Sequence, residues 1–378
     1  MQGKRIVLIT DFTGYSGTKT YFLLLADYLL RKGYQLEVFL ASKDSLSNQE
    51  YLDFKTKPIT FHYLPKILFT DNLFLKRLRI NKLLQFLFLF VFRLSSSVSR
   101  LFVSTGHPFS FLSGAWLWGK KFVYIQHTYP QGSPSSFTKL ISGIRSAWFS
   151  QMAKRRFSFI TVSEASKRLI LDLINLSDKK FPIRVLYTPC RFTQPISHSS
   201  SGPVVLTIGH LERWKNPDFW LEVAISVARQ NNEVSFIWEG TGSMMEGIQR
   251  RIPEDLRDRI QLVGFRENLL DLFSTSSIYF QPSLVESQGL SVVEAMAHAL
   301  PCVVSNHGGL PEMTDHAKTG YVIELKAELG AERLLFLLQN PDIAIKMGQA
   351  GYEKYRQNFT PEIWEKKMDR LLFDTTEA

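Results

Sequence analysis

The chain has little of what usually marks a secreted, metal-binding or membrane-spanning protein. Its 378 residues include only two cysteines, Cys190 and Cys302, and neither lies near a second cysteine. A disulfide framework or zinc knuckle is therefore not expected, and a reducing compartment fits. The apolar run Ile6–Thr10 is too short for a signal-peptide core, so we expect a cytoplasmic protein. No Asp-x-Asp pattern and no ligand-spaced His, Cys or Asp cluster occurs, so we expect no metal ion.

Positive charge is concentrated in the first half of the chain. The net charge is +10, but residues 1–200 contain 28 Lys and Arg against 10 Asp and Glu, whereas residues 201–378 contain 17 against 25. Such asymmetry usually indicates that one half faces an anionic partner. The candidates are a membrane surface, a lipid-diphosphate acceptor and nucleic acid. The alternative is a solvated basic surface without a partner, because net charge bears on association rather than on fold.

One segment of the basic half, residues 73–94, is strongly apolar. Its uncharged stretch Leu83–Phe92 has ten residues, about half of the ~20 needed to cross a bilayer. As a helix it could lie in the membrane interface, with the preceding basic side chains against acidic headgroups. The alternative is a buried helix in the core of the first domain. The basic residues are Lys76, Arg77, Arg79 and Lys82.

Short apolar runs alternate with helix-like segments along nearly the whole chain. Runs rich in Val, Ile and Phe between helices are typical of parallel strands covered on both faces. The polar stretch 194–203 interrupts the alternation and is interpreted as a linker. The pattern therefore predicts two doubly wound α/β domains, residues 1–195 and residues 203–358. The expected strands include Arg5–Thr10, Leu36–Ala41, Ile59–Leu64, Leu101–Ser104, Phe122–His127, Val204–Ile208, Val234–Trp238, Ile278–Gln281 and Cys302–Ser305.

The segment after the expected strand Ile278–Gln281 carries the strongest chemical signal. Ligands of doubly wound sheets bind beyond the carboxyl ends of the strands, which is where the loop acid Glu286 falls. A helix is expected to begin near Ser291, so the amides of Gly289, Leu290 and Ser291 would stand at a helix start. Such amides favour binding of a phosphate group.

A second carboxylate in this segment, Glu294, has two interpretations. A carboxylate can accept two hydrogen bonds from a vicinal diol, each worth about 1.5–3 kcal/mol. Glu286 and Glu294 could therefore each hold a polyhydroxylated group beside the phosphate. However, Ser291-x-x-Glu294 also has the spacing of a capping box, and taken alone the spacing favours the cap. Glu286 has no comparable structural explanation.

Three potential cations, His210, Arg213 and Lys215, follow the first strand of the second domain. Asn216 is a suitable N-cap and Pro217 a suitable first helical residue, so the cations precede a helix N-terminus. This arrangement suits a diphosphate leaving group. The alternative for Lys215 is a solvated loop lysine.

Together these motifs resemble the retaining glycosyltransferases of family four, which have the GT-B fold. The resemblance extends over essentially the whole chain, and its most specific parts are the E-x7-E pair Glu286 and Glu294 with the following Gly308-Gly309-Leu310-Pro311-Glu312. It implies two Rossmann-like domains that face each other across a cleft. The second would bind a nucleotide-diphosphate sugar and the first an acceptor, and a C-terminal helix within residues 361–378 would pack back on the first domain.

The resemblance also implies roles for individual residues. Glu286 would hold hydroxyls of the transferred sugar, and Glu294 would hold the ribose diol. Lys215 matches the phosphate-binding lysine of the family. The family more often has arginine at the position of His210, for which Arg213 could substitute. The other expected donor contacts are Gly17, Gly240, Gly264, Phe265, Ser287, Gly289, Leu290 and Ser291.

His127, at the end of the expected strand Phe122–His127, completes the expected catalytic group with Lys215 and Glu286. Without the resemblance it would more often be a structural histidine. By the resemblance it faces the donor sugar near the reacting carbon.

We therefore expect a metal-independent, retaining hexosyltransferase that uses a nucleotide-sugar donor as substrate and needs no cofactor. Its acceptor would be a hydroxyl of a lipid-linked or cell-surface polysaccharide intermediate, and the protein could be peripheral on the inner face of the membrane. A nucleotide-sugar epimerase or a phosphorylase on the same fold is the alternative. A nucleic-acid-binding protein is less expected, because the densest motif lies in the acidic half.

Overall fold

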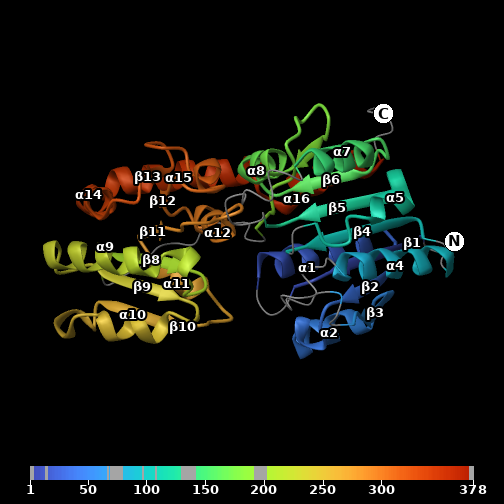
Figure 1. Ribbon diagram of the computed structural model, residues 1–378. Helices are drawn as coiled ribbons and strands as arrows, with labels where there is room; N and C mark the ends of the chain where they lie inside the picture. Colours follow the sequence, from blue (N-terminus) through green and yellow to red (C-terminus); the bar gives the residue numbers. More distant parts are fainter. Residues whose placement is uncertain are drawn as a thin grey trace. The chain divides into compact units, whose positions relative to one another are not determined.

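The computed structural model describes residues 4–12, 16–65, 68, 80–95, 98–106, 109–128, 142–190 and 202–373. It divides the chain into two compact units, Met1–Leu186 and Tyr187–Ala378, and each contains one parallel sheet with helices (Figure 1). The expected linker 194–203 lies almost entirely outside the described residues. The domain limits 1–195 and 203–358 therefore stay predictions.

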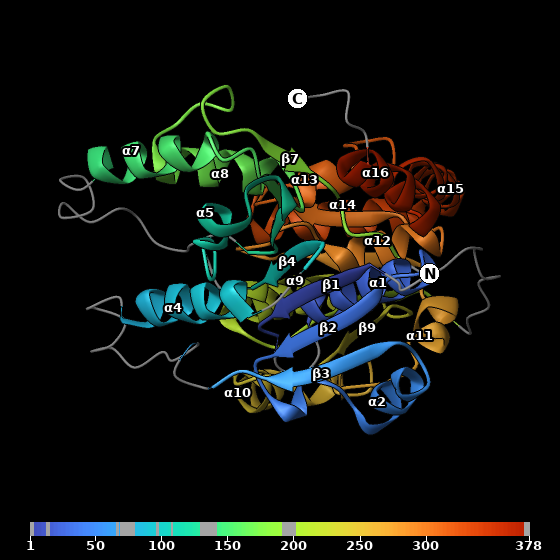
Figure 2. The ribbon, with the colours of Figure 1, turned by 90° about the vertical axis from the view of Figure 1, so that its right-hand side faces the viewer.

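The first unit contains a seven-stranded sheet in the order β3-β2-β1-β4-β5-β6-β7 (Figure 2). All neighbouring strands are parallel. The order reverses direction between β1 and β4, so the loops after these two strands flank the switch point of the sheet. The strands are β1 (Arg5–Thr10), β2 (Gln35–Leu40), β3 (Ile59–Tyr63), β4 (Arg100–Thr105), β5 (Phe122–Gln126), β6 (Ser158–Thr161) and β7 (Ile183–Val185).

Helices bury apolar side chains against this sheet. One core cluster joins inward-facing residues of β1, β4 and β5 to side chains of four helices, among them Leu89, Trp118, Phe149 and Ile170. The helices of the unit are α1 (Gly17–Arg31), α2 (Asn48–Lys55), α4 (Ile80–Ser95), α5 (Gly114–Trp118), α7 (Ser142–Ala153) and α8 (Glu164–Ile174), with short 3-10 turns η1 (Lys43–Ser45) and η3 (Gly119–Lys121).

Helix α4 covers the described part of the apolar segment 73–94. Leu89 is fully buried in the core of the first unit, and the Phe88 and Phe92 rings lie 5.6 and 5.4 Å from the ring of Phe39, centroid to centroid. The core interpretation therefore holds for one face of this helix. The basic residues at positions 76, 77 and 79 lie outside the described residues. Among the described helices, α4 included, none combines the length and the apolar character needed to span a bilayer.

The second unit contains a six-stranded parallel sheet in the order β10-β9-β8-β11-β12-β13. The strands are β8 (Val204–Ile208), β9 (Ser235–Glu239), β10 (Ile260–Gly264), β11 (Ile278–Gln281), β12 (Cys302–Ser305) and β13 (Gly320–Ile323). The helices are α9 (Pro217–Gln230), α10 (Met245–Arg251), α11 (Leu270–Thr275), α12 (Leu290–Ala297), α13 (Leu310–Met313), α14 (Ala327–Gln339), α15 (Pro341–Asn358) and α16 (Pro361–Phe373), with 3-10 turns η4 (Arg213–Lys215) and η5 (Glu254–Leu256).

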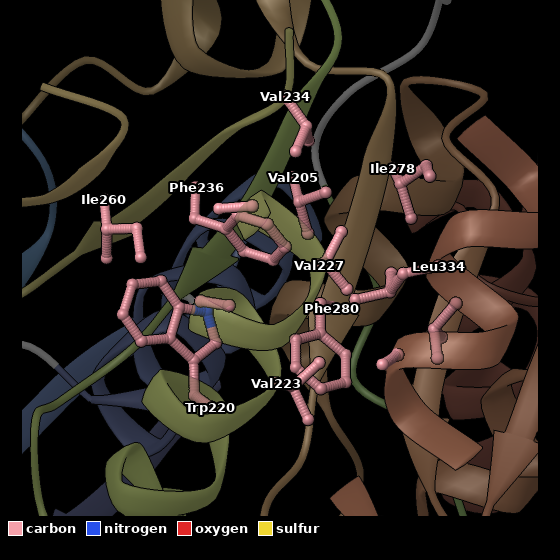
Figure 3. Close-up of a cluster of buried hydrophobic side chains, with 14 of the residues drawn as sticks. Val205, Trp220, Val223, Val227, Val234, Phe236, Ile260, Ile278, Phe280 and Leu334 are labelled. Carbon is pink, nitrogen blue, oxygen red and sulfur yellow. The ribbon is translucent and has the colours of Figure 1, made fainter. Parts of the chain in front are cut away.

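Both faces of the second sheet are covered, because successive side chains of a strand point to opposite faces. On one face Val205 and Phe280 meet Trp220 of α9 and Leu334 of α14 (Figure 3). On the other face Leu206 and its neighbours meet the buried side of α12 and the end of α15. A sheet buried on both sides is what the continuous apolar runs predicted.

The order of the second sheet reverses between β8 and β11. The loops after these strands, residues 209–216 and 282–289, therefore flank the switch point, where doubly wound sheets bind ligands. Helix α16 belongs to the second unit by its contacts within the chain. That it packs back on the first domain stays a prediction.

Candidate active site

The acid loop, residues 282–289, leads from β11 into α12. Gly289 is the N-cap of α12 with φ 95°, and the helix begins at Leu290. The first amide groups of a helix have no carbonyl partner within it, and they carry the positive end of the helix dipole. The structure thus presents the backbone of Leu290 and Ser291 to an anion at the carboxyl end of the sheet.

The capping box that the spacing of Ser291 and Glu294 suggested is not formed. Ser291 lies inside the first turn of α12, and its hydroxyl donates to Gln281 Oε1 over 3.1 Å. The N-cap position is Gly289, which has no side chain to cap the helix. The carboxylate of Glu294 is therefore not engaged as a cap, which leaves it available for another function.

Two consecutive glycines hold the acid loop in place. At Gly308, with φ 58°, a Cβ atom would lie only 1.9 Å from the carbonyl oxygen of Glu286. The amide of Gly309 donates to the same oxygen over 2.9 Å. From the other end of the loop, Gln288 exchanges two hydrogen bonds with the backbone of Thr188, at 2.7 and 2.9 Å. The Gly-Gly pair thus fixes the backbone that carries Glu286.

Lys215 reaches the acid loop from the neighbouring loop after β8. Its Nζ lies 2.6 Å from Glu286 Oε2, and the side chains retain only 13% and 16% of their exposure. The carbonyl of Trp214 accepts hydrogen bonds from the amides of Leu284 and Val285, so the two loops are also joined through the backbone. The lysine stem passes over Gly209, where a Cβ atom would lie 3.1 Å from Cε. Lys215 is therefore a positioned cation, not the solvated lysine of the alternative.

A row of polar side chains continues from this ion pair into the protein. The hydroxyl of Ser283 lies 3.5 Å from Glu286 Oε2 and accepts a hydrogen bond from the amide nitrogen of Gln281 over 2.7 Å. Tyr279, fully buried, donates to Gln281 Oε1 over 2.6 Å. These bonds orient Gln281 and Ser283 beneath the acid.

Glu294 lies in an environment that disfavours its charge. Burial and the nearby carboxylate of Glu239 raise its pKa to about 7, although the charge of Lys215 acts in the opposite direction. Glu239 itself is 4% exposed; burial raises its pKa, and the amide of Arg266 donates to its Oε1 over 2.9 Å. The carboxylates of Glu294 and Glu239 and the ammonium group of Lys215 therefore lie close enough for their charges to interact.

Sequence reasoning missed Glu239. Its signal was an acid that ends an otherwise apolar strand, β9, directly before Gly240. The other expected residues of this region are placed around it. Gly240 donates to the carbonyl of Gly264 over 2.9 Å, so the turns after β9 and β10 are joined. The ring of Phe265 is 45% exposed next to this junction.

The cations before α9 differ in position. His210 is exposed and its charge acts on Glu239. Arg213 is exposed as well, and its guanidinium forms no ion pair among the described residues. That Arg213 replaces the arginine that the family has at the position of His210 stays a prediction. Asn216 occupies the N-cap position of α9 before Pro217, as expected, but in the left-handed conformation and without a side-chain cap. Ser287 lies in the acid loop, where its carbonyl faces Gly309.

His127 and Gly17 belong to the first unit. His127 directly follows β5 and is 7% exposed; its Nε2 lies 2.9 Å from the hydroxyl of Ser104, and the edge of its ring contacts Tyr21. Burial lowers the pKa of His127 to about 4, against the charge of Asp11, so the imidazole is neutral at physiological pH. Gly17 is the first residue of α1.

The neighbouring Lys19 is buried and forms an ion pair with Glu50 at 2.7 Å. The approach of Gly17 and His127 to the residues of the second unit stays a prediction.

Solved structures show which class of fold this is. HepE of Anabaena, in complex with UDP and glucose, matches with a TM-score of 0.74 and 16% identity, over 98% of this chain and all of that one. TarM of Staphylococcus aureus, in complex with alpha-GlcNAc-glycerol, UDP and fondaparinux, matches with a TM-score of 0.73 and 14% identity, over 98% and 100%. The expected GT-B fold is confirmed.

Family models identify the chain more closely. The model for glycosyltransferase family 4 matches residues 15–189, and the model for glycosyl transferases group 1 matches residues 192–354. The chain therefore belongs to the group 1, family 4-like glycosyltransferases, as its motifs predicted.

Curated relatives match over shorter stretches. N-acetyl-alpha-D-glucosaminyl L-malate synthase of Bacillus anthracis is 30% identical over 120 residues, 32% of each chain. A UDP-Gal:alpha-D-GlcNAc-diphosphoundecaprenol alpha-1,3-galactosyltransferase of Escherichia coli is 30% identical over 126 residues, 32% of this chain and 33% of the relative. The alignments with these two span about a third of each relative's length.

Proposed function

We propose that the protein is a retaining hexosyltransferase that moves a sugar from a nucleotide-diphosphate donor to an acceptor hydroxyl without a metal ion. The observation that supports this most is the ion pair of Lys215 and Glu286 at the start of α12. At this position a cation and an acid lie beside the first amides of a helix. A sugar diphosphate offers the matching groups, two phosphates and adjacent hydroxyls.

The diphosphate is the leaving group of the reaction. The bond between the anomeric carbon and the diphosphate oxygen breaks, a bond from that carbon to the acceptor oxygen forms, and the acceptor proton is released. Negative charge accumulates on the departing oxygen, where Lys215 and the amides of Leu290 and Ser291 would stabilise it. Because these groups are already held by the fold, little reorganisation is needed during the reaction.

The sugar would be held by Glu286. In the free protein this acid is bound to Lys215, so the donor would exchange partners: a phosphate oxygen for the lysine and sugar hydroxyls for the acid. Each hydrogen bond to the charged acid is worth about 1.5–3 kcal/mol. The hydrogen bond from the Ser283 hydroxyl orients the acid, and the close packing of Gly308 and Gly309 on the carbonyl of Glu286 keeps the acid loop in position.

The nucleoside would bind at the turns after β9 and β10. Glu294 would accept hydrogen bonds from the ribose diol, and the exposed ring of Phe265 offers a surface on which a base can stack. Glu239 holds the Gly264–Arg266 turn through the amide of Arg266. His127, neutral and in contact with Ser104, would meet the sugar from the first unit.

The acceptor is proposed to be a lipid-linked or cell-surface polysaccharide intermediate. The E. coli relative is named for a diphosphoundecaprenol substrate, and another relative, from S. aureus, for poly(ribitol-phosphate). The excess of basic residues in the first 200 positions suits such anionic acceptors. Both cysteines are buried and neither forms a disulfide, which supports a cytoplasmic location.

A donor panel tests this proposal. Ligand-detected NMR with UDP, GDP and ADP sugars is expected to show binding of at least one sugar nucleotide. The product of turnover with a saccharide acceptor is then expected to keep the anomeric configuration of the donor, and EDTA is expected to leave the rate unchanged. Binding of no sugar nucleotide would overturn the proposal, an inverted product its stereochemistry, and inhibition by EDTA its metal independence.

A further inference from the structure

Helix α4 has an exposed apolar face opposite the face that it buries in the first unit. The exposed fractions are 58% for Leu83, 46% for Leu87, 43% for Phe90, 62% for Val91 and 74% for Leu94. At 3.6 residues per turn these five side chains lie within an arc of about 100°, along about 16 Å of helix. Single exposed apolar residues need no explanation, but a continuous stripe of them indicates an interaction site.

The stretch of chain that contains this face carries positive charge only. Between Asp71 and Glu164 the sequence contains 13 Lys and Arg and not one Asp or Glu. Helix α5 packs beside α4 (Figure 2), where the guanidinium of Arg93 lies 5.8 Å from the centroid of the Trp118 ring. The charges nearest to the apolar stripe therefore have no acidic counterpart on their own elements.

Further cations lie around α5, the helix that packs beside α4. The guanidinium of Arg155 lies 4.5 Å from the centroid of Trp116, and its carbonyl approaches Gly119 in η3. Lys120 and Lys121 of η3 are exposed. None of the four cations, Arg93, Lys120, Lys121 and Arg155, forms an ion pair among the described residues, so they remain available to an anionic partner.

From this arrangement we infer that the exposed face of α4 and the adjoining cations bind the surface of an anionic lipid bilayer. The apolar stripe enters the boundary between headgroups and acyl chains, while the cations stay at the level of the headgroups. An interfacial helix needs both components: buried apolar area, and electrostatic attraction of basic residues to the acidic headgroups. The inference does not depend on the proposed sugar transfer and can fail or hold independently of it.

The apolar component is tested by co-sedimentation with vesicles of phosphatidylcholine with and without phosphatidylglycerol. The wild type is expected to sediment with the anionic vesicles. The double variant Leu87→Gln/Leu94→Gln is expected to bind them about tenfold more weakly or worse. The matched control Leu52→Gln/Leu169→Gln replaces leucines that are 53% and 42% exposed on α2 and α8, and it is expected to bind like the wild type.

The charge component has its own matched pair. Lys120→Gln/Lys121→Gln is expected to weaken binding to anionic vesicles about tenfold and to make the residual binding less sensitive to salt. Lys179→Gln/Lys180→Gln removes two adjacent exposed lysines elsewhere in the first unit and is expected to have little effect. Circular dichroism melts show whether each variant is folded, and these exposed positions are expected to leave the melting temperature unchanged.

Three results would overturn the inference. The wild type could stay in solution with anionic vesicles, or the α4 variant could sediment as well as its control. The face could instead serve a second copy of the chain, which would appear as a lipid-independent dimer that the α4 variant loses. Salt-sensitive binding of duplex DNA in place of vesicles would assign the cations to nucleic acid.

Discussion

Replacing Glu294 with glutamine is expected to stabilise the second unit while it weakens donor binding. The side chain is isosteric, but it removes a carboxyl whose pKa in the folded protein is about 7, because of burial and the neighbouring Glu239, against an ordinary value of 4.5. In the wild type the folded state keeps its proton to a higher pH than the unfolded state. Between pH 4.5 and 7 the contribution of Glu294 to the free energy of unfolding therefore falls as the pH rises.

The size of this effect follows from the shift. About 2.5 pKa units at 1.36 kcal/mol each give a loss of about 3 kcal/mol that is complete above pH 7 and absent below pH 4.5. Glutamine does not titrate, so the Glu294→Gln variant is expected to melt roughly 5–10 °C above the wild type at pH 8 and close to it at pH 4.5. Scanning calorimetry at the two pH values measures the difference. Glu222→Gln, on the exposed side of α9, is the control and should follow the wild type.

Donor binding should move in the other direction. An amide offers fewer acceptor positions to a ribose diol than a carboxylate does, so Glu294→Gln is expected to weaken the sugar nucleotide about tenfold. In the wild type, the ionised fraction of Glu294 rises about tenfold between pH 6 and pH 8, and donor affinity should rise with it. If the melting difference is the same at both pH values, or if the variant loses stability and affinity together, the reasoning about this acid is refuted.

The remaining predictions concern three other positions. Lys215→Ala should lower kcat/KM for sugar transfer at least tenfold. The control Lys326→Ala, which removes an ion-paired lysine from the surface, should leave kcat/KM unchanged. If both variants transfer sugar as fast as the wild type, Lys215 is not part of the active site. Gly308→Ala should lower the melting temperature by several degrees, because its Cβ would lie 1.9 Å from a carbonyl oxygen of the acid loop. The control Gly247→Ala places its Cβ in open space and should melt like the wild type. Equal melting temperatures for the two variants would show that Gly308 does not fix the acid loop. Since the pKa of His127 is lowered to about 4, its contribution to the free energy of unfolding should be lost as the pH drops from 6.5 to 4, opposite in sign to that of Glu294. In urea titrations the stability of the wild type relative to His127→Gln should therefore fall over this range; a difference that does not change with pH would show that His127 is not the titrating group.

Much of the second unit could be predicted because its strands are continuous apolar runs between turns. The bounds of β8, β11 and β12 coincide with the expectation, since parallel strands covered on both faces form nearly continuous apolar runs. Helix α15 is harder to predict from the sequence, because it is rich in polar residues and carries glycines, which disfavour helix. The structure explains one of them: at Gly348 a Cβ would lie 1.9 Å from the carbonyl of Ala299.

The site could be predicted in outline but not in its contacts. Strand ends located Glu286 and Lys215, and the doubly wound order places their loops on either side of one switch point. That the two side chains form an ion pair depends on the adjacency of β8 and β11, which lie more than 70 residues apart. The role of Glu239 could not be predicted either, because its effect on Glu294 depends on β9 and β11 both lying next to β8. The capping box shows that spacing alone is not enough: Ser291 and Glu294 have the correct spacing, but the helix already begins at Leu290, one residue before Ser291, and the capping bonds are not formed.

The central claim is that Lys215 serves the diphosphate and Glu286 the sugar, and calorimetric titration of Glu286→Gln tests it most directly. With the donor identified by the panel, the variant should bind the nucleoside diphosphate as tightly as the wild type or more tightly, because Lys215 is released from its ion pair. The extra affinity that the wild type shows for the sugar nucleotide over the nucleoside diphosphate should be lost. A variant that keeps this extra affinity, or that loses both ligands equally, would contradict the account.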